Sequence, residues 1–419
     1  MTRRTVDSGQ VAVFALLALP VILGMVGLAI DVGYLRYTKR QMQTAADSGA
    51  IAGGLAVNDT PSDYVTLAKS AAGADGFTDG TNGVAVTVNM PPKYGPHAGQ
   101  TGYVETIIIQ SKPAMFAAIL GAGPVTVAAR AVAWGGANGK SCIYALGSTA
   151  PIGTSISGVN FTAQCGTVID SVSSTGLSAS GSNISAPYFG MVGPGYSVSG
   201  SNTGNTLFVT GIPPVSDPLA YLPVPSVSTS CSGTSDSISG QIGVTVTPGS
   251  SCYNVSVNGS INVTFNPGQY SSITISGSTG VTFNPGLYTI VGSGGLNFGG
   301  SNVSATGVTF YLGPNAGAVT ATGSNSSLTA PTTGTYAGIL FFQNPSDTNA
   351  ATIGGSNSTV VGALYFPKAR LTFNGSNATS AYTILVANTV VFSGSNATVN
   401  NNYATLSGGS PIHTAVLVE

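Results

Sequence analysis

A short repeat fills the carboxyl-terminal two-thirds of this 419-residue chain and most constrains its fold. The repeat is Gly-Ser-Asn, with Gly-Ser variants at Gly259 and Gly277, and most copies follow one another at intervals of roughly 18 to 23 residues. It begins at Gly181, Gly200, Gly259, Gly277, Gly300, Gly323, Gly355, Gly375 and Gly394. Between the motifs lie short alternating runs, and the run VTFNPGQY (263–270) returns as VTFNPGLY (281–288). This spacing predicts a solenoid in which each repeat forms one coil.

Each interval has room for three strands of four to six residues, which is what one coil of a parallel β-helix requires. Gly adopts the left-handed conformation needed at a sharp bend, and Asn tolerates it. Stacked Asn side chains can also bond from coil to coil. We therefore assign turn roles to Asn183, Asn202, Asn302, Asn325, Asn357, Asn377 and Asn396. We predict a right-handed parallel β-helix, with an antiparallel β-sandwich as the alternative.

The interval from Gly323 to Gly355 holds an insertion, 332–349, which we expect to form an external loop. Many Asn residues of the repeat also lie in Asn-x-Ser/Thr sequences, which can accept glycans in an exported protein. Because most of them follow Gly-Ser at the coil period, a turn role explains them without glycosylation.

Residues 11–30 form an uncharged and almost wholly apolar run near the amino terminus. A helix of this length matches the hydrocarbon thickness of a bilayer, and such a helix tolerates Pro20. A cleaved signal peptide is the alternative, but its apolar core is shorter than this run. We expect a retained membrane anchor. Arginines and lysines lie on both sides of it, so the positive charges do not decide its orientation.

Charged residues make up only 6% of the chain, and the net charge is −1 with no basic run. Nucleic-acid binding therefore has no electrostatic basis. Beyond residue 170 the charged residues are Asp217, Asp236, Asp347, Lys368, Arg370 and Glu419. Catalytic sites need converging acids, bases or metal ligands, and this region supplies few. We expect neither an enzyme nor a bound cofactor or metal.

The four cysteines are Cys142, Cys165, Cys231 and Cys252. An even number in a polar, β-rich region indicates disulfides and an exported domain. Three pairings are possible. We favour pairing of sequence neighbours, Cys142 with Cys165 and Cys231 with Cys252, while four free buried thiols remain the alternative.

The region between the apolar run and the repeats reads as a small α/β domain. Residues 64–72 suit a short helix, and 114–120 suit a second. Alternating runs at 84–89, 103–110 and 125–134 predict three strands, the first two separated by a Pro/Gly-rich turn. This order allows a sheet that packs on the helix emerging from the membrane.

The first 57 residues or so resemble the amino-terminal module of TadE/TadG-like (tight adherence) pilus-assembly proteins. The resemblance rests on Gly9, on the apolar run with Phe14 and Pro20, on Asp31, and on 43–52. The core of that last stretch is Ala45, Ala46 and Asp47. The stretch to about residue 135 also looks like the small domain that follows this module in related proteins.

This resemblance implies a single-pass, pilin-like protein of the bacterial cell envelope, with its bulk periplasmic or extracellular. Its implied role is the assembly or anchoring of Flp-type pili, or surface adhesion, with Tad/Flp components or self-association as partners. Gly9 stands where pilin-type processing cuts. Phe14, however, occupies the fifth position after it, where Glu is typical, which argues against cleavage by a prepilin peptidase.

The alternative function is a membrane-anchored β-helix that binds or cleaves polysaccharides, with surface glycans as ligands. Lys368 and Arg370 are two residues apart, so on a strand they share one face. Together with Asp347 they are the candidate site for an acidic ligand, against the alternative of a solvated cationic spot. A third possibility is a passive envelope protein without a pilus partner.

The sequence thus predicts a mainly β chain with four segments. These are a short tail (1–9), a transmembrane anchor with its continuing helix (10–57), a small α/β domain (58–140), and the β-helix (141–419).

Overall fold

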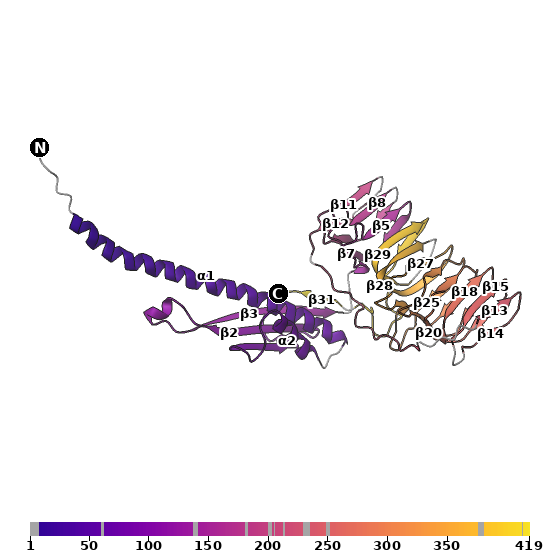
Figure 1. Cartoon of the computed structure of the whole chain (residues 1–419), viewed down its shortest axis with the longest axis horizontal. Helices are drawn as coiled ribbons and strands as arrows, with labels where there is room; N and C mark the ends of the chain where they lie inside the picture. The colour runs from indigo at the N-terminus through magenta and orange to yellow at the C-terminus, as the bar shows by residue number, and fades with distance from the viewer. Residues whose placement is uncertain are drawn as a thin grey trace. The chain divides into compact units, whose positions relative to one another are not determined.

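The computed structural model describes most of the chain, and Figure 1 shows its elements. The described ranges are 8–59, 63–136, 141–180, 183–199, 203–204, 206–212, 214–228, 235–248, 252–375, 381–412 and 414–419. The chain forms two compact units. The first contains residues 1–136 together with 413–419, and the second contains 137–412.

The first unit combines one long helix with a four-stranded antiparallel sheet. Its helices are α1 (Ser8–Asp59), α2 (Tyr64–Ala74) and the 3₁₀ turn η1 (Ala117–Leu120). Its strands, in sheet order, are β1 (Val84–Asn89), β2 (Tyr103–Lys112), β3 (Val125–Gly136) and β31 (Thr414–Leu417). The three strands and the first short helix expected between residues 58 and 140 are confirmed.

α1 is one continuous helix that contains Pro20 and joins an apolar first part to a second part packed on the sheet. The face of the second part is built from small residues, including the fully buried Ala45, Ala46 and Ala50. A Cβ atom placed on Gly49 would lie 2.9 Å from Thr106 Cγ2, and one on Gly53 would lie 2.8 Å from Val104 Cγ1. The small side chains therefore let helix and sheet approach closely, which gives a packing reason for the Ala/Gly-rich stretch 43–56.

β31 corrects the expected domain boundary at residue 419. Residues 414–417 pair with β3 in antiparallel register, with Gly136 opposite Thr414 and Ala133 opposite Leu417. They therefore belong to the sheet of the first unit and not to the β-helix. The second unit is consequently an insertion between two neighbouring strands. Likewise, the expected segments 10–57 and 58–140 fold as one unit, since α1 packs on β2 and β3.

The second unit is a parallel β-solenoid, as predicted, with three faces. Two long strands, β28 (Thr359–Gly375) and β29 (Thr383–Gly394), bend from one face to the next. In order along the axis, the first face contains β13 (Ser235–Ser239), β15 (Asn254–Asn258), β18 (Ser272–Ser276), β21 (Leu296–Phe298), β24 (Val319–Ala321), β27 (Ala351–Gly354), the later parts of β28 and β29, β5 (Thr154–Ser157), β8 (Leu177–Ser180) and β11 (Tyr196–Ser199).

The second face contains, in the same direction, β17 (Gly268–Tyr270), β20 (Gly286–Ile290), β23 (Val308–Leu312), β26 (Ile339–Gln343), the middle of β28, the start of β29, β4 (Ser141–Ala145), β7 (Gly166–Ile169), β10 (Tyr188–Met191) and β12 (Leu207–Thr210). The third face contains β14 (Thr245–Val246), β16 (Thr264–Phe265), β19 (Thr282–Phe283), β22 (Ser304–Thr306), β25 (Ser327–Thr329) and the start of β28, and in a separate ladder β30 (Asn396–Val399), β6 (Asn160–Ala163) and β9 (Ile184–Ser185). The right-handed coiling stays a prediction.

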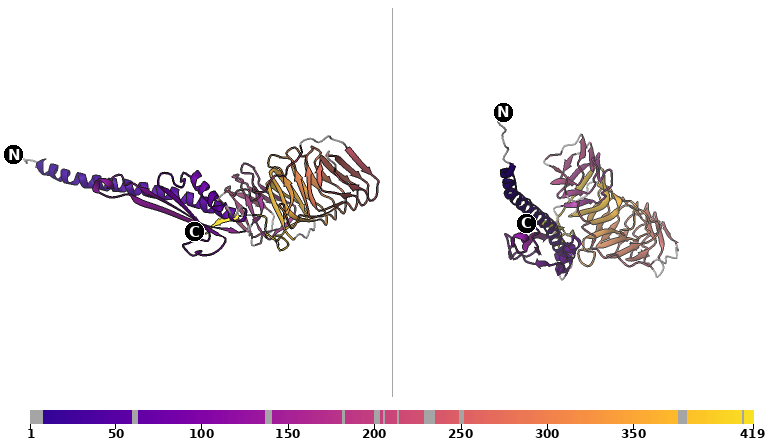
Figure 2. Two further views of the ribbon diagram at one scale, coloured as in Figure 1. Left: turned by 90° about the horizontal axis from the view of Figure 1, so that it is seen from below. Right: turned by 60° about the vertical axis from the view of Figure 1, so that its left-hand side comes forward.

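The spatial order of the coils differs from their order in the sequence. The first coil of the unit stacks on the last one, because β29 pairs with β4 and β5 and because β30 pairs with β6. Along the axis the stack therefore runs from residue 235 to 399 and continues from 141 to 210. Entry and exit of the solenoid lie at this internal junction, and Figures 1 and 2 show the strands of both parts stacked in one solenoid.

A return segment, residues 212–228, connects the two free ends of the stack. Hydrogen bonds join this segment to strands of the second face. The Ile212 amide donates to the backbone oxygen of Met191 in β10, and Asp217 Oδ2 accepts from Tyr365 Oη in β28 at 2.8 Å. At its far end the amide of Ser228 donates to Gln269 Oε1 in β17 at 2.8 Å. The chain thus travels back along the outside of its own solenoid before it begins the second series of coils.

The repeated sequence VTFNPG(Q/L)Y places equivalent side chains on top of one another. Phe265 stacks on Phe283 with ring centroids 4.8 Å apart, and Tyr270 stacks on Tyr288 at 6.0 Å. All four rings are buried, so the repeat builds a continuous aromatic column in the core.

The expected external loop 332–349 is corrected in its extent. Residues 339–343 form β26, a fully buried strand of the second face that pairs with β23 and β28. The additional residues of this long coil lie on either side of β26. The strand was not predicted because its five side chains are all buried and do not alternate between apolar and polar.

Candidate functional site

Asp31 fastens the β2–β3 connection to α1. Its carboxylate accepts three backbone hydrogen bonds, from Met115 at 3.0 Å, from Phe116 at 3.0 Å to Oδ2, and from Ala117 at 2.7 Å. These amides precede or begin η1, where backbone N–H groups have no partner within the turn. Asp31 is 5% exposed, so the carboxylate serves this contact and not solvent.

Asp47, the other acid of the family-like motif, lies in the second part of α1 and accepts a hydrogen bond from the same helix. Gln43 Nε2 donates to Asp47 Oδ1 at 2.8 Å and to the backbone oxygen of Arg130 at 3.0 Å. The motif residues therefore have structural roles: Ala45 and Ala46 pack on the sheet, while Gln43 links the helix to β3. Gly9, Phe14 and Pro20 all lie in α1, and Phe14 is exposed.

The most charged cluster of the first unit centres on Arg130 in β3. Its guanidinium donates to Glu105 Oε1 at 2.5 Å, to Glu419 Oε2 and to the backbone oxygen of Tyr94. Burial raises the pKa of the Glu105 carboxyl, but hydrogen bonds from Arg130, the Lys93 amide and Asn89 outweigh burial, so the net pKa is lowered. This cluster holds the β1–β2 turn against the sheet.

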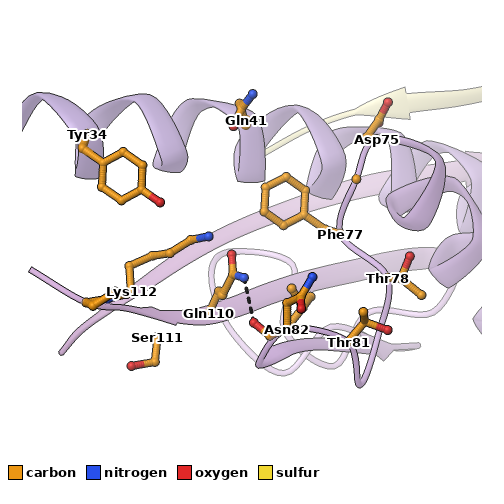
Figure 3. A pocket seen from close by; sticks show the side chains of 13 residues that line it. Tyr34, Gln41, Asp75, Phe77, Thr78, Thr81, Asn82, Gln110, Ser111 and Lys112 are labelled. Atoms are coloured by element: carbon orange, nitrogen blue, oxygen red, sulfur yellow. Dashed lines mark hydrogen bonds between the residues drawn. The ribbon is translucent and has the colours of Figure 1, made fainter. Parts of the chain in front are cut away.

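A polar groove lies between α1 and the edge of the sheet, with a volume of about 610 Å³. Figure 3 shows Tyr34 and Gln41 on the helix and Gln110, Ser111 and Lys112 on the strand across from them. Gln110 Nε2 donates to Asn82 O at 2.9 Å, while its buried Oε1 has no hydrogen-bond partner in the structure. The groove offers hydrogen-bonding groups together with Lys112 and Asp75, so it is suited to binding polar groups.

The three candidate ligand residues have different surroundings. Lys368 and Arg370 are both exposed on β28 with the buried Ala369 between them, which confirms that they share the outer face. Asp347 is 2% exposed and accepts hydrogen bonds from Gln343 Nε2 at 3.1 Å and from the Asn349 amide at 2.9 Å. The Asp347 carboxylate thus organises its own loop, and a ligand role for the two cations stays a prediction.

Lys368 interacts electrostatically with Asp217 of the return segment. Burial raises the pKa of the Asp217 carboxyl, and hydrogen bonds from Leu219 and Tyr365 and the charge of Lys368 only partly offset this. Sequence reasoning missed this pair because the two residues are 151 positions apart in the chain and no local motif joins them.

Three of the Asn residues assigned turn roles, Asn302, Asn325 and Asn357, have a left-handed backbone. Their φ angles are 55°, 50° and 54°, in the left-handed region. Asn183 and Asn396 contribute to a ladder instead, in which Asn183 Nδ2 donates to Asn160 Oδ1 at 3.2 Å and Asn160 Nδ2 to Asn396 Oδ1 at 3.1 Å. Asn202 and Asn377 lie outside the described residues.

A disulfide between Cys142 and Cys165 joins two successive coils, as predicted. Cys252 is also disulfide-bonded. Cys231 lies outside the described residues, so the second pairing stays a prediction. Among the residues that the structure describes, no three His, Cys, Asp or Glu side chains gather as metal ligands.

The first part of α1 is long and apolar enough to cross a membrane, with a mean hydropathy of 2.3. Only 11% of that apolar window is buried, which distinguishes it from the core helix of a soluble domain. The fold therefore defines a class of protein in which an apolar helix continues into a small helix-on-sheet domain that carries an inserted β-solenoid.

Residues 9–58 match the family of putative Flp pilus-assembly TadE/G-like proteins. The match covers the apolar part of α1 and the helical face that packs on the sheet, and it confirms the resemblance expected from Gly9, Asp31 and Asp47. Comparison of the chain with curated proteins and with solved structures gives no match.

Proposed function

We propose that this chain is a single-pass protein of the bacterial cell envelope that acts with Tad/Flp pili. In this proposal the first part of α1 is the membrane anchor, the helix-on-sheet domain docks with pilus components, and the β-solenoid is a stiff projection for assembly or adhesion. The observation that carries the proposal is the TadE/G-like match on a helix whose apolar part is exposed.

The disulfides support a location of the solenoid outside the cytoplasm, since thiols stay reduced inside the cell. The β29–β4 junction and the Asn ladder tie the two series of coils into one body, which suits a rigid projection. We also propose a non-catalytic role. The outer faces carry Ser, Thr and Asn with few charges, so adhesive contacts would be hydrogen bonds with weak salt dependence.

Removal of the solenoid tests docking and adhesion separately. Gly136 of β3 lies opposite Thr414 of β31, so a two-residue Asn-Gly turn can replace residues 137–413 and close a β-hairpin. We expect the excised variant to stay in the membrane fraction and to co-purify with pilus components. Cells carrying it should attach to surfaces less well than cells carrying the full chain.

Two results would contradict this division of roles. If the full chain fails to co-purify with Tad/Flp components from cells that assemble pili, pilus association is wrong. If the excised variant supports attachment as well as the full chain, the solenoid is not the adhesive part. A matched control joins the same two residues through an unrelated soluble domain, which tests whether bulk alone restores attachment.

The exposed Lys368 and Arg370 pair keeps polysaccharide binding as a second candidate. A K368A/R370A variant should then lose retention on an acidic polysaccharide while its circular dichroism is unchanged. Turnover of a uronic-acid polysaccharide by the full chain, abolished in this variant, would favour the carbohydrate-cleaving alternative over the adhesion proposal.

A further inference from the structure

The connection between β2 and β3 is an apolar segment exposed beside the membrane-spanning part of α1. Residues 113–124 read PAMFAAILGAGP and contain no charged side chain. Ile119 is 81% exposed, Met115 56% and Phe116 42%, so the segment presents large apolar groups without covering them. Such an apolar patch on a protein surface marks an interaction site.

Specific contacts hold this segment against the end of the apolar run. Phe116 packs on Gly27, where an added Cβ would lie 2.8 Å from Phe116 Cβ. One turn further along α1, the Asp31 carboxylate holds the amides of residues 115–117. Gly27 supplies the space and Asp31 the hydrogen bonds, so α1 is built to receive the segment at this level.

The geometry of the sheet places the segment toward the membrane. β2 runs antiparallel to α1, because Val104 lies near Gly53, Thr106 near Gly49 and Phe116 near Gly27. Figures 1 and 2 show the β2–β3 hairpin reaching along α1 toward the helix's amino-terminal half. The apolar run ends at Ile30, and Gly27 lies about 6 Å before Asp31 at 1.5 Å per residue.

A cleft of about 360 Å³ is lined by this segment and by α1 beside their contact. Its lining is wholly apolar and includes Leu23, Val26, Ile30, Phe116 and Ile119. Farther along α1, Arg36, Lys39 and Arg40 are exposed, at the level expected for lipid headgroups. Acyl chains are the occupant that this combination fits, since the first part of α1 beside the cleft is itself apolar and exposed.

We propose that residues 113–124 insert into the lipid interface as a second membrane contact beside the transmembrane part of α1. This inference rests on the membrane anchoring proposed above. Two contacts on one domain would restrict its rotation and tilt relative to the bilayer, which a single helix does not. The partner is the lipid bilayer itself, contacted at the boundary between headgroups and acyl chains.

The test uses the full chain in vesicles of phosphatidylcholine brominated either high or deep on the acyl chains. The chain has a single tryptophan, Trp134, whose emission in the parent is subtracted. Ile119→Trp probes the segment, and Leu19→Trp probes the middle of the apolar run. Tyr94→Trp, in the turn at the opposite end of β2, is the matched control on an exposed position of the same sheet.

We expect the Ile119→Trp probe to lose emission most with bromine placed high on the chains, and the Leu19→Trp probe with bromine placed deep. The Tyr94→Trp probe should keep its emission in both. A Met115→Trp variant should repeat the result for residue 119. If Leu19→Trp is quenched while Ile119→Trp behaves like Tyr94→Trp, the insertion of this segment is wrong and anchoring stands. If Leu19→Trp is not quenched either, the anchoring proposal fails and this inference fails with it.

Discussion

Asp31 shows how one side chain joins two distant stretches of the first unit. Its three amide partners lie more than 80 residues along the chain, and all of them are backbone groups. The sequence singled out Asp31 through a family resemblance. Its partners could not be predicted, because a backbone N–H has no residue identity to recognise.

Replacing Asp31 should therefore weaken the first unit. Asp31→Ala leaves three amides without their charged acceptor, so we expect the free energy of unfolding to fall by about 2 kcal/mol or more. Asp31→Asn should have a smaller effect because it keeps one acceptor oxygen. The measurement is denaturant unfolding in detergent, followed by the fluorescence of Trp134 in β3.

The matched control for Asp31 is Asp75→Asn, an exposed carboxylate of the same unit. It should change stability little. Equal stability of the parent chain and Asp31→Ala would show that the amides find other acceptors at no cost.

The buried Asp170 and the half-buried Asp217 make the solenoid sensitive to pH. Burial raises the pKa of Asp170 and of Asp217, against the hydrogen bonds that partly offset it. The folded solenoid therefore binds protons that the unfolded chain releases, and its stability falls as pH rises through the folded-state pKa values. On acidification the free energy of unfolding rises until the pH reaches the pKa of Asp in the unfolded chain, about 3.9.

We expect the thermal unfolding of the solenoid, followed by far-UV circular dichroism, to shift to higher temperature between pH 7 and about pH 4.5. In the first unit Glu105 has a lowered pKa and loses its contribution only below that window. The D170N/D217N variant should show a flatter profile than the parent. An unchanged profile in this variant would rule out the two acids as the source.

At the scale of elements, the turns of the solenoid follow from residues that accept a left-handed backbone. Gly-Ser-Asn places Asn at a positive φ in three coils, and Gly280 occupies the equivalent place with φ 67°. Strand β1 has the bounds that its alternating sequence predicts. These parts were predictable because turn chemistry and side-chain alternation are local properties of the sequence.

Asn302 tests the turn at the level of one coil. Asn302→Gly should leave stability unchanged or slightly raised, whereas Asn302→Ala should cost about 1 kcal/mol, because a Cβ is strained at φ 55° without the Asn side chain. Asn297→Ala in β21 of the same coil is the control, since Asn297 is an exposed strand residue. Chemical denaturation of the three variants measures the differences, and equal costs at both positions would contradict the turn role.

At the scale of the whole molecule, the chain inserts a solenoid between β3 and β31 and enters it at an internal coil. Neither feature was predictable from the sequence. β31 is four residues long and its partner strand lies more than 270 residues earlier. Because the coils carry similar repeats, the sequence of one coil does not indicate which other coil lies beside it. The pairing of β29 with β4 and β5 therefore has no sequence signature.

An engineered disulfide tests the coil order directly. Ser155 of β5 and Val391 of β29 are register partners between buried neighbours, so both side chains point outward. A S155C/V391C variant should form a cross-link that peptide mapping by mass spectrometry detects, since adjacent parallel strands lie about 4.8 Å apart. S155C/T352C pairs the same residue with a more distant coil and should not cross-link. Cross-linking in the second variant but not in the first would contradict the order.

The central claim is that the chain is anchored in the membrane and acts with Tad/Flp pili. The measurement that tests it most directly is cell fractionation with mass spectrometry of the native amino terminus, in cells with and without an intact Tad system. We predict a mature chain that retains residues 11–30, resides in the membrane fraction, and associates with pilus components only when the system is intact. A chain that begins after Ile30 and is found in the soluble fraction of both strains would contradict the claim.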